Sequence, residues 1–346
     1  MRSLFRLSLA GALLGLLALG SYLYWFSINS LNPEPKIYVV KPGSSLRAFT
    51  VDLYEQNVLP DKFSLVWLAY LKGQSRDLKA GEYRFRKGMT ALELLDQVIA
   101  GRVVEYPLTI VEGWSFRQIL QALAAAPRVT HTVQEMSAPQ IMASLGYPKL
   151  HPEGRFYPDT YYYPGGMSDL LILQRAFQKM DARLQQEWEG RDKTSPLKTT
   201  DEALALASII ERETARAEER DLIAGVMVNR LRKNMKLQTD PTVIYGMGDR
   251  YRGNLRSQDL REYTPYNTYV IKGLPPTPIA MPSGEAVRAA LNPADTKALY
   301  FVSRGDGSHE FSETLEQHNK AVIKYQLGGK PKTAQTNKTV SAPAPR

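Results

Sequence analysis

The feature that most constrains this chain is a long apolar segment near its N-terminus. No charged residue stands between Arg6 and Glu34, and residues 7–26 read LSLAGALLGLLALGSYLYWF. About 20 consecutive apolar residues are enough for a helix to cross a bilayer. The segment therefore predicts a transmembrane helix over residues 7–26, and the remainder of the chain has to fold outside the membrane.

The two ends of this segment predict its orientation. Arg2 and Arg6 precede it, and basic residues beside a membrane helix tend to stay on the cytoplasmic side. We therefore expect residues 1–6 to form a short cytoplasmic tail and the body of the chain to be extracytoplasmic. The other end carries the residues of an interfacial aromatic belt, Tyr22, Tyr24 and Trp25.

A cleaved signal peptide is the alternative interpretation of the same segment. The small-residue sequence Ala18-Leu19-Gly20 could serve as its cleavage site. The aromatic cluster that follows this site is typical of a membrane interface, so it favours a retained anchor.

Composition excludes several classes of site. The chain has no cysteine, which excludes disulfides, zinc-thiolate sites and cysteine nucleophiles. Its four histidines show no ligand spacing, so we expect no metal. The net charge of +9 comes without a basic run or a nucleic-acid-binding motif. We therefore expect no nucleic acid, and an anionic partner such as lipid head groups or a carboxylate-bearing wall polymer fits better.

The rest of the chain predicts two domains of α+β class. Residues 27–36 (SINSLNPEPK) are typical of a polar, proline-bearing linker. A small domain is predicted over residues 37–102 and a larger, mixed domain over residues 103–327. Residues 328–346 lack aromatic residues and are rich in Pro, Thr, Lys and Ala, which predicts a disordered tail.

The small domain is predicted to have the order strand, helix, helix, strand, helix. Its last helix begins with a capping box, in which Thr90 is the N-cap and Glu93 stands three residues later. Residues 39–46, a strand with a KPGSSL turn, resemble the opening of a LysM-type glycan-binding module. Any small α+β domain beside a membrane is the alternative.

A pair of carboxylates stands at the end of a helical run in the larger domain. Residues 208–214 read SIIERET, within a helix predicted over residues 202–232 and broken near Thr214. At about 100° per residue, Glu213 falls within the apolar stripe of this helix and Glu211 falls beyond its edge. The stripe consists of Ala203, Leu206, Ala207, Ile209 and Ile210.

Burial makes Glu213 the candidate general acid. A carboxyl group in an apolar setting is costly unless it stays protonated or finds a partner. The alternative is that both glutamates are solvated charges that pair with Arg212, Arg216 and Arg220.

A tyrosine-rich segment, residues 153–164, is a second candidate for the site. Its rings could stack on sugars, or it could be a core strand. Asp159 lies there between a proline and a threonine, where an aspartate commonly organises a loop, and we include it as a tentative binding residue.

Several segments together resemble one family. They are SIIERETA, VNRL, LQTDPTVIYGMG, YNTY, GLPP, Phe311-Ser312 and His318-Asn319, in this order. In these segments the chain resembles the YceG-like endolytic murein transglycosylases, and the resemblance covers roughly the whole chain. It implies cleavage of peptidoglycan glycan strands between N-acetylmuramic acid and N-acetylglucosamine, without water and without a cofactor.

The resemblance also implies a mechanism and a location. Glu213 matches the family's catalytic glutamate, and it would give a 1,6-anhydro end by acting first as acid and then as base. The protein would be anchored in the bacterial inner membrane with its catalytic domain in the periplasm, and peptidoglycan synthases are candidate partners. Tentative substrate-binding residues, each with a structural role as the alternative, are Thr214, Gln238, Asp240, Tyr245 and Asn267.

Two competing functions remain at the level of sequence. One is a non-catalytic peptidoglycan-binding division scaffold with a vestigial cleft. The other is a hydrolase with two carboxylates, for which Glu219 is the best second group.

Overall fold

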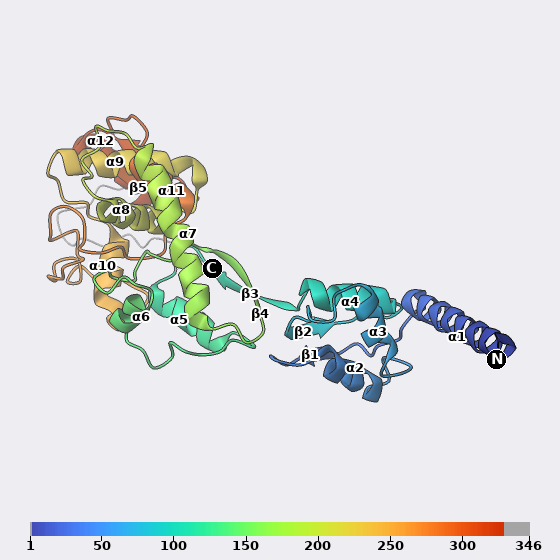
Figure 1. Ribbon diagram of the computed structural model, residues 1–346. Coiled ribbons are helices and arrows are strands. Elements are labelled where there is room, and N and C mark those ends of the chain that lie inside the picture. The colour runs from blue at the N-terminus through green and yellow to red at the C-terminus, as the bar shows by residue number, and fades with distance from the viewer. Residues whose placement is uncertain (1, 329–346) are drawn as a thin grey trace. The chain divides into compact units, whose positions relative to one another are not determined.

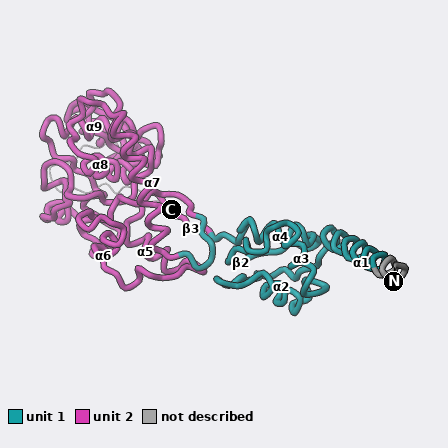
Figure 2. The backbone as a smooth tube through the Cα atoms, viewed as in Figure 1, with its two compact units in different colours: residues 1–106, 162–167 teal, residues 107–161, 168–346 magenta. Residues whose placement is uncertain are grey.

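The structure of the protein, a computed structural model, describes residues 2–328 and contains two compact units. Unit 1 comprises residues 1–106 and 162–167, and unit 2 comprises residues 107–161 and 168–346, as Figure 2 shows. Both contain helices and strands, which confirms the α+β class. The tail predicted from residue 328 onward lies, from residue 329, outside the described residues.

Unit 1 begins with a helix longer than the predicted one. Helix α1 extends over Arg2–Ile28, and its part Leu9–Ile28 is long and apolar enough to cross a membrane. Its leucines from residue 9 to residue 19 are exposed, whereas Leu23 and Phe26 near its end are buried in the core of unit 1 or beside it. The last turns of α1 are therefore part of the folded unit.

The remainder of unit 1 has the predicted order of elements (Figure 1). These are β1 (Ile37–Val40), α2 (Leu46–Glu55), α3 (Ser64–Leu71), β2 (Gly81–Arg84) and α4 (Ala91–Ala100). Strands β1 and β2 pair antiparallel, with Ile37 opposite Arg84. The capping box of Thr90 and Glu93 is present, as predicted. The likeness to a LysM module stays a prediction.

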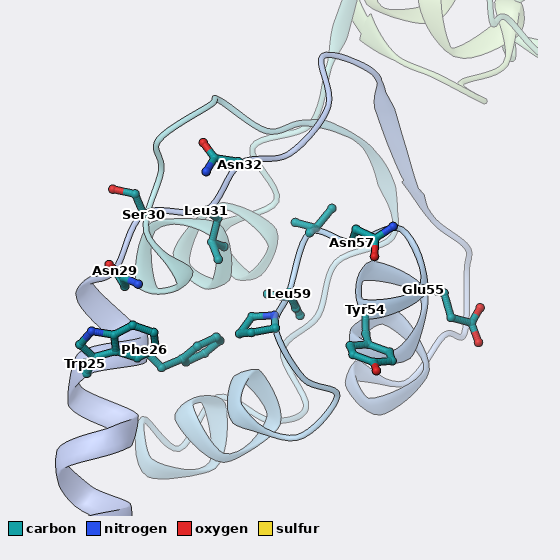
Figure 3. A pocket seen from close by; sticks show the side chains of 12 residues that line it. Trp25, Phe26, Asn29, Ser30, Leu31, Asn32, Tyr54, Glu55, Asn57 and Leu59 are labelled. Atoms are coloured by element: carbon teal, nitrogen blue, oxygen red, sulfur yellow. The ribbon is translucent and has the colours of Figure 1, made fainter.

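The segment predicted as a linker is attached to unit 1. The Leu31 N–H donates to the Met89 carbonyl at 2.7 Å, and the Gly88 N–H donates to the Leu31 carbonyl at 2.8 Å. The Leu31 side chain belongs to the core of the unit. A pocket of about 600 Å³ lies at this junction, with Trp25, Asn29 and Tyr54 in its lining, as Figure 3 shows.

Unit 2 is mainly helical. Strands β3 (Glu105–Ile110) and β4 (Asp159–Pro164) pair with each other, and the boundary between the two units falls within both of them. The other elements, in chain order, are α5 (Phe116–Ala125), α6 (Ala138–Ser144), α7 (Asp169–Glu189), α8 (Thr200–Glu213), η1 (Ala217–Glu219), α9 (Arg220–Arg232), α10 (Asp240–Met247), η2 (Gly248–Arg250), α11 (Gly284–Leu291), β5 (Tyr300–Ser303), β6 (His309–Ser312) and α12 (Leu315–Gln326). Strands β5 and β6 form an antiparallel hairpin.

Helix α8 is at the centre of this unit. It packs against α7, α9, α10 and α11, and every residue from Ala203 to Ile210 is buried. The long helix predicted over residues 202–232 breaks where it was expected to: α8 ends at Glu213, and Thr214 has extended backbone angles (φ −141°, ψ 138°). The buried helix thus ends at the carboxylate of interest.

Candidate active site

Glu213 is the last residue of α8 and carries an unusual carboxyl group. The residue is half-buried, and burial, reinforced by the negative charge of Asp240, raises its pKa from 4.5 to about 8, while Arg230 acts in the opposite direction. Within residues 2–328 its carboxyl makes no hydrogen bond or salt bridge. Such a group is protonated at neutral pH and is free to donate its proton.

Glu211 has a different environment. Its Oε2 accepts hydrogen bonds from the Ser283 backbone N–H at 2.9 Å and from the Ser283 hydroxyl at 2.5 Å. Ser283 is in turn the N-cap of α11, where its Oγ accepts the Ala286 N–H. Glu211 therefore supports the start of α11, and its carboxylate is already engaged.

Asp240 and Tyr269 interact electrostatically with Glu213. Asp240 begins α10, and its Oδ1 accepts the Tyr269 hydroxyl at 2.7 Å. Burial raises the pKa of Asp240. Burial first, and then the charges of Asp240 and Glu213, raise the pKa of Tyr269. This makes a compact cluster in which extra negative charge is unfavourable.

Arg230 supplies the cluster's positive charge. It is buried in α9, and its guanidinium donates to the carbonyls of Leu299 at 2.6 Å and Leu237 at 2.8 Å. The same group lies over the Tyr300 ring, 5.2 Å from its centroid. Burial lowers the pKa of Arg230, but an arginine stays charged in proteins. Arg230 therefore compensates part of the negative charge around Glu213.

Gln238 is exposed and has a strained backbone. Its φ of 54° lies in the left-handed region, which is unfavourable for a side chain other than glycine, asparagine or aspartate. Its N–H donates to the Thr268 carbonyl at 3.2 Å, and its Oε1 accepts from Arg230 at 3.4 Å. Strain of this kind is often retained at functional sites.

Two other predicted residues have structural contacts. The Thr214 Oγ1 accepts the Arg216 N–H at 3.0 Å, so this side chain stabilises the turn after α8. Asn267 is fully buried, and its amide donates to the carbonyls of Asp259 at 3.1 Å and Glu262 at 2.7 Å. We therefore leave Asn267 out of the proposed binding surface.

Asp159 is already paired with a lysine. It begins β4 and forms a salt bridge with Lys179 of α7, which holds the pKa of its carboxyl below the usual range. The structure gives it no contact with Glu213 among the described residues.

Tyr245 is hydrogen-bonded to Glu153, a buried carboxyl that the sequence did not single out. Its hydroxyl donates to Glu153 Oε2 at 3.0 Å, and Glu153 Oε1 accepts the Phe116 N–H at the start of α5 at 2.9 Å. Burial raises the pKa of Glu153 to about 7. Glu153 stands in a turn-rich segment with no apolar periodicity, so no sequence signal indicates its burial.

Glu219, the alternative second carboxylate, is engaged as well. It is buried, and its Oε1 accepts the His309 backbone N–H at 2.9 Å. Its Oε2 lies 2.7 Å from His309 Nδ1. In the part of the chain that the structure describes, no cluster of three or more His, Asp or Glu side chains could hold a metal ion.

Comparison with known proteins identifies the family of this chain. Residues 38–324 match the YceG-like family. The chain belongs to the YceG-like family. A crystal structure of a YceG-like protein from Listeria monocytogenes superimposes with a TM-score of 0.55 at 30% identity, over 82% of this chain and 98% of that one.

Curated relatives of this YceG-like protein carry one name. A protein from Bacillus subtilis named endolytic murein transglycosylase is 30% identical, over 88% of this chain and 90% of the relative. A protein of the same name from Streptococcus pneumoniae is 29% identical over 90% of this chain, which spans only 63% of that relative's length.

Proposed function

We propose that this YceG-like protein is an endolytic lytic transglycosylase. It cleaves peptidoglycan glycan strands between N-acetylmuramic acid and N-acetylglucosamine and leaves a 1,6-anhydro-muramic acid end. The relatives named endolytic murein transglycosylase support the activity. The observation that carries the proposal for this chain is the half-buried, unpaired carboxyl of Glu213, with its pKa raised to about 8.

In the proposed reaction one carboxyl group acts twice. Protonated Glu213 donates its proton to the glycosidic oxygen, the bond from that oxygen to C1 of the muramic acid breaks, and the N-acetylglucosamine end leaves as an alcohol. The C6 hydroxyl of the same muramic acid then attacks C1 and gives its proton to the Glu213 carboxylate. Because the nucleophile belongs to the substrate, no second carboxylate and no water are consumed.

The neighbouring groups adjust this acid. Burial, together with the negative charge of Asp240, raises the pKa of Glu213 and keeps its proton bound at neutral pH, and Arg230 stabilises the carboxylate that exists between the two proton transfers. Gln238, Asp240 and Tyr245 are the proposed contacts for the sugar rings; Thr214 positions the turn behind Glu213, and Asp159 would touch only a distant part of the strand.

Anchoring by α1 would hold the enzyme at its substrate. We propose that α1 crosses the bacterial inner membrane with the N-terminus in the cytoplasm, which sets unit 2 in the periplasm where glycan strands are assembled. The net charge of +9 suits an anionic wall polymer. Peptidoglycan synthases are the proposed protein partners.

Digestion of purified glycan strands tests this function. Wild type should shorten the strands, and Glu213→Gln should lose activity by at least about 100-fold, because general acid catalysis contributes a factor of this size. The matched control is Glu218→Gln, an exposed glutamate on the turn after α8, which should behave as wild type. Binding without cleavage by wild type would favour the scaffold function instead, and full activity of Glu213→Gln would exclude Glu213 as the acid.

A further inference from the structure

Helix α3 of unit 1 has an apolar surface that nothing in the described chain covers. One side of the helix, Ser64, Leu65, Leu68 and Ala69, is buried in the unit. The opposite side carries large side chains that are half exposed or more, Phe63 (52%), Trp67 (55%), Tyr70 (62%) and Leu71 (72%). We refer to these four residues as the α3 face.

The spacing of the α3 face is that of one continuous stripe. Positions 63, 67, 70 and 71 lie within about 100° of one another around a helix. No charged residue occurs from Phe63 to Leu71, and Lys62 and Lys72 stand immediately outside the segment. Large exposed apolar patches with a polar rim mark sites that contact another protein or a membrane.

The α3 face is attached to the end of the candidate membrane span. Helix α3 packs against α1, as can be followed in Figure 1. The Tyr22 hydroxyl of α1 donates to Asp61 Oδ2 at 2.7 Å, while Asp61 Oδ1 accepts the N–H groups of Phe63 and Ser64, each at 2.8 Å, at the start of α3. The start of α3 is therefore fixed at the level of Tyr22.

The same level of α1 carries an aromatic cluster. The Tyr22 and Trp25 rings stack with centroids 6.0 Å apart, and Tyr24 and Trp25 are exposed. Tyrosine and tryptophan concentrate at the level of lipid head groups. A helix held beside them, with Trp67 and Tyr70 on its open side, lies at the same depth.

We propose that the α3 face is inserted into the head-group region of the bilayer that α1 crosses. The occupant of this surface is the lipid itself, because α3 packs against α1 and is tied to it through Tyr22, and because the face combines aromatic side chains with flanking lysines, the composition of interfacial helices. Unit 1 is then held to the membrane at two points and cannot turn freely about α1. The inference rests on the proposal that α1 spans the membrane.

The absence of cysteine from the chain allows a direct test. Single variants Leu71→Cys, Leu14→Cys and Val39→Cys of the full chain are labelled with a fluorophore and reconstituted into phosphatidylethanolamine and phosphatidylglycerol vesicles that contain nitroxide lipids. Leu14 lies within the span and reports on α1. Val39 is an exposed apolar residue of β1 in the same unit and is the matched control.

We expect the label at residue 71 to lose roughly half of its fluorescence with a head-group nitroxide, and the label at residue 14 to respond to a deep acyl-chain nitroxide. The label at residue 39 should respond to neither. Adding Trp67→Ser and Tyr70→Ser to Leu71→Cys should abolish most of the loss at residue 71, since the remaining apolar area is too small to hold the helix in lipid.

The three labels separate the possible failures. If residue 14 is quenched and residue 71 is not, α1 spans the membrane but the α3 face does not enter it, and the inference is wrong; the face then serves a protein partner that pure vesicles lack. If residue 14 is not quenched, the anchor itself fails and the inference fails with it. Equal quenching at residues 39 and 71 would show unspecific adsorption of unit 1 and would also overturn the proposal.

Discussion

At the scale of single residues, Glu213 and Glu211 show how two carboxylates two positions apart acquire different chemistry. The Glu211 carboxylate holds Ser283, whereas the Glu213 carboxyl is unpaired and its pKa is raised to about 8. Helix geometry predicts their separation, because positions 211 and 213 point about 200° apart. The partners of each depend on distant parts of the chain, which local patterns do not reveal.

We expect Glu213 to destabilise the folded protein near neutral pH. Its pKa is about 8 in the folded chain against 4.5 as the ordinary value, so between these pH values the unfolded chain releases a proton that the folded chain keeps. The free energy of unfolding therefore falls as the pH rises through this window. At pH 7 the free energy of unfolding of Glu213→Gln, measured by urea unfolding, should exceed that of wild type by on the order of 3 kcal/mol.

The pH dependence gives this prediction its control. Below pH 4.5 both states of wild type are protonated at this site, so the difference between Glu213→Gln and wild type should vanish there. Glu218→Gln, at an exposed position, should follow wild type throughout. Equal stability of wild type and Glu213→Gln at pH 7 would show that the carboxyl is not held in its neutral form.

Asp240 should move the basic limit of the reaction to higher pH than burial of Glu213 alone would give. Activity is expected to fall as the pH rises through the Glu213 pKa of about 8. Asp240→Asn removes a negative charge that raises this pKa, so the basic limb of the kcat profile should move to lower pH by roughly one unit. The control Asp249→Asn changes an exposed aspartate just after α10 and should leave the limb in place; an unmoved limb in Asp240→Asn would contradict the cluster.

At the scale of elements, the junction between α8 and α11 depends on Glu211. Glu211→Ala should leave the N-cap residue Ser283 without its acceptor and destabilise unit 2 by about 1–3 kcal/mol in urea unfolding. The protein that remains folded should still cleave glycan strands. Glu218→Ala removes a glutamate of an exposed salt bridge and should cost little.

The Glu211→Ala variant also tests which residue is the acid. A stable Glu211→Ala protein without activity would transfer the acid from Glu213 to Glu211.

Local signals predicted some elements well. Thr90 and Glu93 predict the start of α4, because a capping box is built from residues three apart in sequence. Hairpin β5–β6 and the buried Glu153 were not predicted. Glu153 is buried by contacts with Phe116 and Tyr245, which lie 37 and 92 positions away, and only the folded chain brings these groups together.

At the scale of the whole molecule, α1 serves two purposes. Its exposed leucines suit a membrane span, while Phe26 near its end is 2% exposed and packs in the core of unit 1. The predicted boundary between membrane helix and linker at residue 26 therefore falls within a packed region. A composition change marks where apolar sequence ends, but it does not show which apolar side chains face protein and which face lipid.

This double role predicts a difference between neighbouring aromatic residues of α1. Phe26→Ala should destabilise unit 1 by about 3 kcal/mol, because it removes a buried ring. Tyr24→Ala is the matched control, since Tyr24 is 69% exposed. Hydrogen exchange of the β1 and β2 amides in detergent would measure the difference, and equal protection in the two variants would place Phe26 outside the core.

The central claim is that a single carboxyl group, Glu213, cleaves the glycan strand without water, and mass spectrometry of the new strand ends tests it most directly. Wild type should produce muramic acid ends one water lighter than hydrolysis products, and Glu213→Gln should produce none. Ends that carry the additional water would indicate a hydrolase, and anhydro ends from Glu213→Gln at the wild-type rate would show that another group is the acid.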